Sequence, residues 1–140
     1  MISYPAIFKY DSKGKVYNVE FPDLPGCQTY GETEEDALKY GREALTGYLE
    51  SIDIRKLRIP DPSILKGKNI KYISPDKNVS FAIWLKKNRE VLGLTQKDIA
   101  SRLKIAYQTY QRFEDPVKSN PTLKTIIRLE KVFNQELLKV

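Results

Sequence analysis

The spacing of apolar residues changes once along this chain, and that change constrains the fold more than any other feature. From Ile2 to Tyr10 apolar residues occupy every second position, which is the period of a strand with one buried face. From Val79 onward the apolar residues follow the period of amphipathic helices instead. We therefore expect a domain that contains a sheet, followed by an all-helical domain.

The first part predicts three strands, a helix and a fourth strand. Residues 2–10 and 16–21 alternate on either side of a turn that contains Gly14, so they predict a hairpin. Residues 28–31 fit a short third strand and residues 70–73 an edge strand. Between these strands, Thr33 and Asp36 have the spacing of a capping box before an apolar stripe that runs to residue 52. The prediction is an α+β domain of order βββαβ over residues 1–74.

The second part predicts four helices after a linker over residues 75–79. A first amphipathic helix begins near Phe81 and ends at Gly93. Thr95 precedes a second helix with capping-box spacing, residues 106–114 form a third, and Thr122 precedes a fourth. These helices define an all-helical domain over residues 80–140.

The segment LGLTQKDIASRL, residues 92–103, is similar to the helix-turn-helix of Xre/lambda-repressor-type DNA-binding domains. This resemblance covers about sixty residues from Phe81 to the C-terminus. It implies that Arg89 pairs with Glu114 across the core. Lys104 stands where the family usually has a turn glycine, so either the turn is strained or Lys104 adopts a positive φ. Tyr110 stands where a β-branched residue is commoner.

Groove geometry indicates which side chains would contact DNA. The third predicted helix would be the recognition helix, with Tyr110 and Phe113 facing inward. Its outward residues would then meet base edges, and the other polar residues would contact phosphates. The base-reading candidates are Tyr107, Gln108, Gln111 and Arg112, and the phosphate candidates are Gln96, Thr109, Lys118 and Asn120. The alternative for all of them is a solvated face of a helical bundle.

Helix-turn-helix proteins generally bind two half-sites of double-stranded operator DNA as dimers. We therefore expect a homodimer or a higher oligomer, with dimer contacts in the C-terminal helix between Phe133 and Leu138.

The segment FPDLPGCQTYGETEEDAL, residues 21–38, resembles the N-terminal domain of HicB antitoxins. The resemblance covers about seventy residues. It implies a partial RNase H-like fold that binds and blocks HicA, a small basic RNase toxin, while the C-terminal domain represses the operon. The candidate toxin-binding residues are Asp23, Glu32, Glu34, Glu35 and Glu43.

Charge is distributed in a way that fits two different partners. The net charge is +6, yet residues 1–50 carry five Lys and Arg against nine Asp and Glu, and residues 73–140 carry 13 against seven. The acidic front suits a cationic protein and the basic back suits phosphate. Charge steering would make association with the toxin slower at high salt.

Catalysis and cofactors are not expected. The chain contains no histidine and a single cysteine, Cys27, so a catalytic thiol lacks its usual base and a metal site lacks soft ligands. Cys27 is expected to be a buried small side chain, and the acidic residues a solvated surface or a partner-binding patch rather than a nuclease centre. No segment is apolar enough to span a membrane, and the single cysteine favours the cytoplasm. The alternative function is a stand-alone helix-turn-helix regulator that responds to a small ligand.

Overall fold

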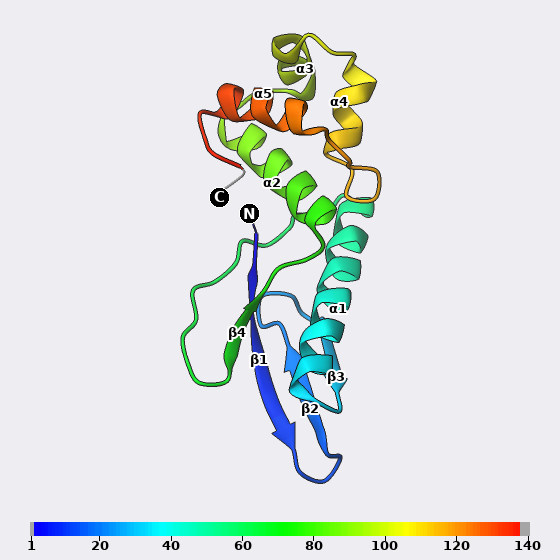
Figure 1. The fold of residues 1–140 in the computed structure, drawn as a ribbon, viewed down its shortest axis with the longest axis vertical. Coiled ribbons are helices and arrows are strands. Elements are labelled where there is room, and N and C mark those ends of the chain that lie inside the picture. Colours follow the sequence, from blue (N-terminus) through cyan, green and yellow to red (C-terminus); the bar gives the residue numbers. More distant parts are fainter. Residues whose placement is uncertain (1, 138–140) are drawn as a thin grey trace. The chain divides into compact units, whose positions relative to one another are not determined.

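The computed structural model describes residues 2–137 and divides the chain after Lys77 into two compact units. Residues 2–77 are called the sheet unit, and residues 78–137 the helical unit. Figure 1 shows strands and one long helix in the former and only helices in the latter. The predicted fold class is therefore confirmed.

The sheet unit contains a four-stranded antiparallel sheet and one long helix in the chain order βββαβ. The strands lie in the order β3-β2-β1-β4, so the last strand of the unit pairs with the first. The elements are β1 Tyr4–Asp11, β2 Val16–Glu20, β3 Gln28–Gly31, α1 Glu34–Ile54 and β4 Ile70–Ile73. This order leaves β3 and β4 as the two edges of the sheet.

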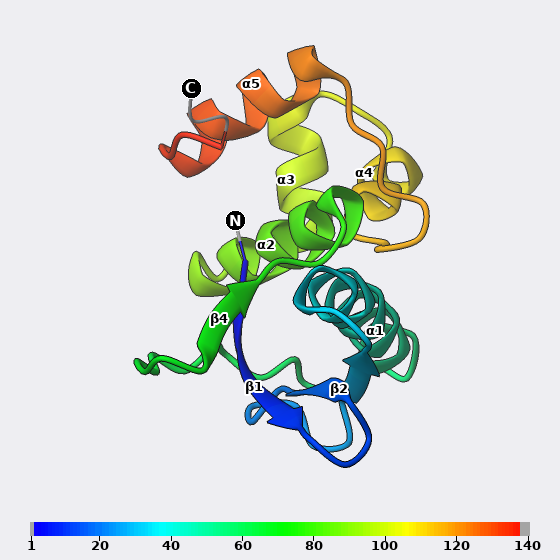
Figure 2. The same ribbon diagram turned by 60° about the horizontal axis from the view of Figure 1, so that its bottom comes forward.

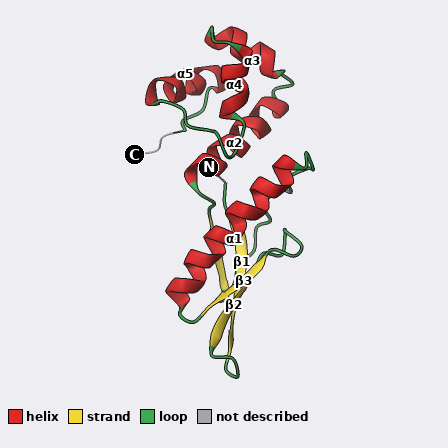
Figure 3. Cartoon of the chain, turned by 90° about the vertical axis from the view of Figure 1, so that its right-hand side faces the viewer, coloured by secondary structure: helices red, strands yellow, loops and turns green. Residues whose placement is uncertain are grey.

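One face of the sheet is covered by α1, as Figures 2 and 3 show. The register pairs Phe8 with Val19 and Tyr4 with Ile73, so the alternating apolar residues of three strands share this face. The helix contributes apolar residues at the spacing of one helical face. The buried residues of this layer include Tyr4, Ala6, Phe8, Val19, Ile73, Ala37, Leu45 and Leu49.

The start of α1 lies unusually close to β3, and Gly31 makes this approach possible. A Cβ atom built on Gly31 would lie 2.4 Å from the backbone nitrogen of Ala37 and 2.8 Å from its Cα. Any side chain at this position would therefore collide with helix backbone. The helix itself begins as expected, because the Thr33 hydroxyl accepts a hydrogen bond from the Asp36 N–H at 3.0 Å.

The helical unit contains four helices around one apolar core. Trp84 packs edge-on against Phe133, with ring centroids 5.5 Å apart. Tyr110, fully buried, packs edge-on against Phe113 at 6.3 Å. The elements are α2 Lys77–Val91, α3 Gln96–Leu103, α4 Tyr107–Phe113 and α5 Leu123–Phe133. The core residues are Phe81, Leu85, Ile99, Ala100, Leu103, Tyr110, Leu129 and Phe133.

Two details differ from the sequence prediction. Helix α2 begins at Lys77, inside the predicted linker 75–79. Polar residues that suggest a linker by composition are equally suited to the first turn of a helix, where backbone N–H groups lack intrahelical acceptors. Phe133, a predicted dimer contact, is only 6% exposed and belongs to the core, so Phe133 itself is wrongly assigned, while contacts by the residues after it stay a prediction. Leu138 lies outside the described residues.

Candidate nucleic-acid interface

The turn between α3 and α4 has the geometry of a helix-turn-helix, and local interactions define it. At the start of α3, Thr95 and Asp98 form a reciprocal capping box, with N–O distances of 2.8 and 3.1 Å. Hydrogen bonds from Thr95, first of all from its backbone N–H, lower the pKa of Asp98. At the end of α3, where the turn begins, Lys104 has φ of 57°, the left-handed conformation that was one of the two expectations for this position.

A buried ion pair joins the end of α2 to the end of α4. Arg89 donates from Nε to Oε2 of Glu114 at 2.7 Å and from Nη2 to Oε1 at 3.0 Å. It also donates to the carbonyl of Leu94 at 2.9 Å. The side chains are 13% and 3% exposed, respectively, and the hydrogen bond to the carboxylate raises the pKa of Arg89. The pairing implied by the family resemblance is therefore confirmed.

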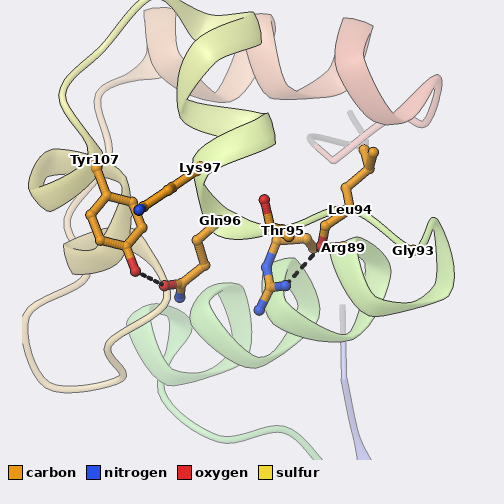
Figure 4. Close-up of a pocket in the computed structure, with 7 residues that line it drawn as sticks. All are labelled: Arg89, Gly93, Leu94, Thr95, Gln96, Lys97 and Tyr107. Carbon is orange, nitrogen blue, oxygen red and sulfur yellow. Dashed lines mark hydrogen bonds between the residues drawn. The ribbon is translucent and has the colours of Figure 1, made fainter.

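A hydrogen-bonded chain extends from this ion pair to the surface of α4. Gln96 donates from Nε2 to Oε1 of Glu114 at 3.1 Å. The Tyr107 hydroxyl donates to Oε1 of Gln96 at 3.3 Å, as Figure 4 shows. Gln111 donates from Nε2 to the Tyr107 hydroxyl oxygen at 3.0 Å. Sequence periodicity does not reveal this chain, because it links residues on two different helices, α3 and α4.

An open pocket lies beside this chain at the start of α3. Lys97 gives its wall a positive charge, and Arg89, which also lines it, is paired with Glu114 (Figure 4). The Lys97 ammonium also lies 5.5 Å from the centroid of the Tyr107 ring, within the range of a cation–π contact. The remaining lining residues are Gly93, Leu94, Thr95, Gln96 and Tyr107. A cationic recess at a helix N-terminus is suited to an anion such as a phosphate.

The predicted DNA-binding residues are accessible. Six of them are exposed on α4 or on the segment that follows it, and two at the pocket are half-buried. The exposed residues are Gln108, Thr109, Gln111, Arg112, Lys118 and Asn120, and the half-buried ones are Gln96 and Tyr107. The amide of Gln96 uses one N–H and its oxygen inside the protein, which leaves a single N–H for a phosphate.

The structure separates the five acidic candidates into two groups. Asp23 accepts hydrogen bonds from the backbone N–H of Ser63 at 2.8 Å and from its hydroxyl at 2.5 Å, so this carboxylate anchors the connection before β4. Glu34 forms an ion pair with Lys71 of β4. Both carboxylates thus have partners within the sheet unit. Glu32, Glu35 and Glu43 are exposed.

Glu32 lies at a second open pocket, of about 530 Å³, between the β3 edge and the start of α1. Asp36 also lines this pocket, together with two tyrosines of which Tyr30 is 63% exposed and Tyr40 is 40% exposed. The sequence places Asp36 at the helix N-terminus, among acidic residues of a solvated or partner-binding surface, and does not single out the tyrosines. Their proximity depends on how α1 crosses β3, which periodicity does not reveal.

Cys27 is a structural residue of the loop before β3. Its side chain is 3% exposed, and burial raises the pKa of the thiol to about 11. The loop is held by backbone hydrogen bonds, among them Cys27 N–H to the Leu24 carbonyl at 2.9 Å, and Gly26 has φ of 84°. A protonated thiol in this setting is a poor nucleophile.

We expect Cys27 to react with iodoacetamide about 100-fold more slowly at pH 8 in the folded protein than in the urea-unfolded chain, since its pKa is near 11 rather than 9.0. The measurement is the alkylation rate by mass spectrometry. The folded-state rate should rise with pH until about 11. A folded-state rate that levels off near neutral pH would show an activated thiolate and contradict this assignment.

The described part of the chain contains neither a cluster of metal ligands nor a membrane-spanning helix. Within residues 2–137 no group of three or more His, Cys, Asp or Glu side chains is placed to hold a metal ion. Among these residues no helix is both long and apolar enough to cross a membrane.

Two family models match the chain, one in each half. The model described as "HicB_like antitoxin of bacterial toxin-antitoxin system" matches residues 3–74, which is just over half of the chain. A model described as helix-turn-helix matches residues 85–140. Both resemblances drawn from the sequence are thereby confirmed.

Individual relatives match less than half of the chain. UPF0150 protein Ta0767 of Thermoplasma acidophilum is 39% identical over 59 residues, covering 42% of this chain and 84% of that protein. Antitoxin HicB 2 of Photorhabdus laumondii is 37% identical over 60 residues, covering 43% of this chain and 42% of the antitoxin. The match thus spans less than half the length of HicB 2.

Among solved structures, the N-terminal domain of the Burkholderia pseudomallei antitoxin HicB is similar, with 29% identity and a TM-score of 0.47. The match covers 54% of this chain and 99% of that one. The family model over residues 3–74, which covers more than half of the chain, decides the assignment: the chain belongs to the HicB-like antitoxin family of bacterial toxin-antitoxin systems.

Proposed function

We propose that this protein is the antitoxin of a HicA/HicB-type pair. The sheet unit binds and blocks a small basic RNase toxin, and the helical unit binds double-stranded operator DNA and represses its own operon. The protein acts in the cytoplasm as a homodimer or higher oligomer, through binding alone and without a cofactor.

The observation that carries the DNA half is the arrangement of α3, the turn and α4. Lys104 closes a tight turn with φ of 57°, and α4 then presents Gln108, Gln111 and Arg112 to solvent. Exposed glutamine and arginine side chains on such a helix match the donors and acceptors of base edges in the major groove. Residues 73–140 also carry 13 Lys and Arg against seven Asp and Glu, which favours binding to phosphate.

We expect Arg112→Ala and Lys118→Ala to weaken DNA binding in different ways. Loss of Arg112 should relax the preference at one base pair by about tenfold, because arginine reads guanine through two hydrogen bonds. Loss of Lys118 should weaken binding to every duplex alike. It should also reduce the steepness of the plot of log K against log salt concentration by about one. Anisotropy titrations on the protein's own upstream DNA and on single-base-pair variants distinguish these effects. A uniform loss with Arg112→Ala would contradict its role.

Charge and shape support the toxin half. Residues 1–50 carry five Lys and Arg against nine Asp and Glu. Of the acidic candidates, Glu32 lies beside Asp36, Tyr30 and Tyr40 at the β3 edge pocket. Carboxylates flanked by exposed aromatic rings suit a basic protein surface. We propose that Glu32 and Glu35 attract the toxin, whereas Asp23 and Glu34 stabilise the sheet unit.

The experiment is co-expression of the full chain with any short basic protein encoded beside it. Co-purification and rescue of growth would support the antitoxin role. Charge reversal by Glu32→Lys with Glu35→Lys should slow association about tenfold at low salt and less at high salt. The matched control is Glu34→Gln, whose carboxylate already pairs with Lys71. If no neighbouring protein binds while the operator does, the ligand-responsive regulator becomes the better description.

A further inference from the structure

The hydrogen-bonded chain at the start of α3 has only one consistent direction of donation. It begins at Glu114, whose carboxylate can only accept and is held by Arg89. Gln96 must therefore turn its NH₂ group toward Glu114, at 3.1 Å. The opposite orientation of the Gln96 amide would place two acceptor oxygens against each other.

The direction continues outward to the surface. With its NH₂ group toward Glu114, Gln96 presents its oxygen to Tyr107, whose single hydroxyl hydrogen is donated to it. The Tyr107 oxygen can then only accept from Gln111, and it does so from Nε2 at 3.0 Å. The buried ion pair thus determines which end of an exposed amide is held against the protein.

We propose that this chain fixes the amide of Gln111 so that its oxygen faces the DNA, and that Gln111 reads a base carrying an exocyclic amino group in the major groove. This inference rests on the proposed DNA binding. Adenine with its N6 amino group and cytosine with its N4 amino group offer the required donor, whereas guanine and thymine offer acceptors there. Tyr107 is the positioning residue. Gln111 is exposed on α4, and the Lys97 ammonium 5.5 Å from the Tyr107 ring helps to hold that ring in place.

The experiment compares base preferences of full-length variants by selection from a randomised duplex library, followed by titrations. Gln111→Ala identifies the base pair that Gln111 reads, where we expect the wild type to prefer adenine or cytosine about 5- to 150-fold. Tyr107→Phe removes both hydrogen bonds of the hydroxyl but keeps the ring. It should reduce the preference for adenine or cytosine at this base pair to about threefold or less. Affinity for a duplex of unrelated sequence should fall by a much smaller factor.

Gln108 supplies an internal control, because it lies on the same helix next to Tyr107 and is exposed. The base pair identified by Gln108→Ala should keep its preference in Tyr107→Phe. Gln96→Leu, which frees the Tyr107 hydroxyl to point either way, should relax the Gln111 base pair as Tyr107→Phe does.

Several results would overturn the inference. They are an unchanged preference in Gln111→Ala, a wild-type preference for guanine or thymine at its base pair, and a full preference retained in Tyr107→Phe. In each case specific binding by the wild type would leave the DNA-binding proposal standing. A wild type that binds all duplexes equally or none would instead refute that proposal, and the inference with it.

Discussion

Replacing Arg89 by methionine is expected to lower the free energy of unfolding of the helical unit by about 3–5 kcal/mol. Methionine keeps most of the aliphatic volume but leaves the Glu114 carboxylate, which is 3% exposed, without a cation. The Leu94 carbonyl also loses its donor. An uncompensated buried charge is far more costly than the loss of a surface ion pair.

Trp84 makes this measurement specific to the helical unit. It is the only tryptophan in the chain and packs against Phe133 in the core, so its fluorescence in urea reports the unfolding of this unit. The matched control is Arg102→Met on exposed α3 surface, with an expected change within about 0.5 kcal/mol. The double variant Arg89→Met with Glu114→Leu should recover much of the loss, because it removes the buried charge as well. If Arg89→Met and Arg102→Met lower the free energy of unfolding by the same amount, the assigned role of the ion pair is contradicted.

Gly31→Ala is expected to destabilise the sheet unit by about 3 kcal/mol. The added Cβ would lie 2.4 Å from the Ala37 nitrogen and 2.8 Å from the carbonyl carbon of Asp36. These are backbone atoms at the start of α1, so relief requires the helix to move away from β3. Such a shift would loosen the packing of α1 on the sheet.

Gly47→Ala is the matched control within the same unit. Gly47 lies inside α1, and a Cβ at this position meets no atom within 4 Å. Alanine should therefore stabilise the helix by about 1 kcal/mol, through its higher helix propensity. If the free energy of unfolding falls with Gly31→Ala and rises with Gly47→Ala, the close approach at Gly31, rather than glycine content, controls stability.

Cys27 reports on the sheet unit as Trp84 does on the helical unit. It is the only cysteine and is 3% exposed, so the urea concentration at which Cys27 becomes rapidly alkylated reports the unfolding of the sheet unit. If Gly31→Ala lowers the free energy of unfolding by about 3 kcal/mol, that urea midpoint should fall. A midpoint equal to that of the unchanged protein would refute the close approach of α1 to β3.

Features that depend on residues close together in the chain were predictable. The capping residues Thr33, Thr95 and Thr122 each accept from the N–H three residues later, and this spacing is visible in the sequence. The αL conformation at Lys104 was one of two alternatives that the resemblance implied, because Lys104 occupies the place of the family's turn glycine. The order of strands and helices followed from the two periodicities, because each period reports which face of an element is buried.

Composition misjudged two segments for a physical reason. The polar residues Lys77 and Asn78 suggested a linker, yet α2 begins at Lys77. Phe133 near the end of the chain suggested a dimer contact, yet it packs on Trp84. In both cases residue type is compatible with two environments, and only the packing of neighbouring helices selects between them.

The amino-acid sequence by itself determined the two-part architecture, the helix caps, the tight turn and the family, because all of these are expressed over short spacings along the chain. Tertiary structure alone decided which polar groups meet. It joined Asp23 to Ser63 over 40 positions, Glu34 to Lys71 over 37, and Gln96 to Glu114 over 18. Partners this far apart are set by how helix and strand faces pack, and that packing determines which carboxylates stabilise the fold and how Gln111 is oriented.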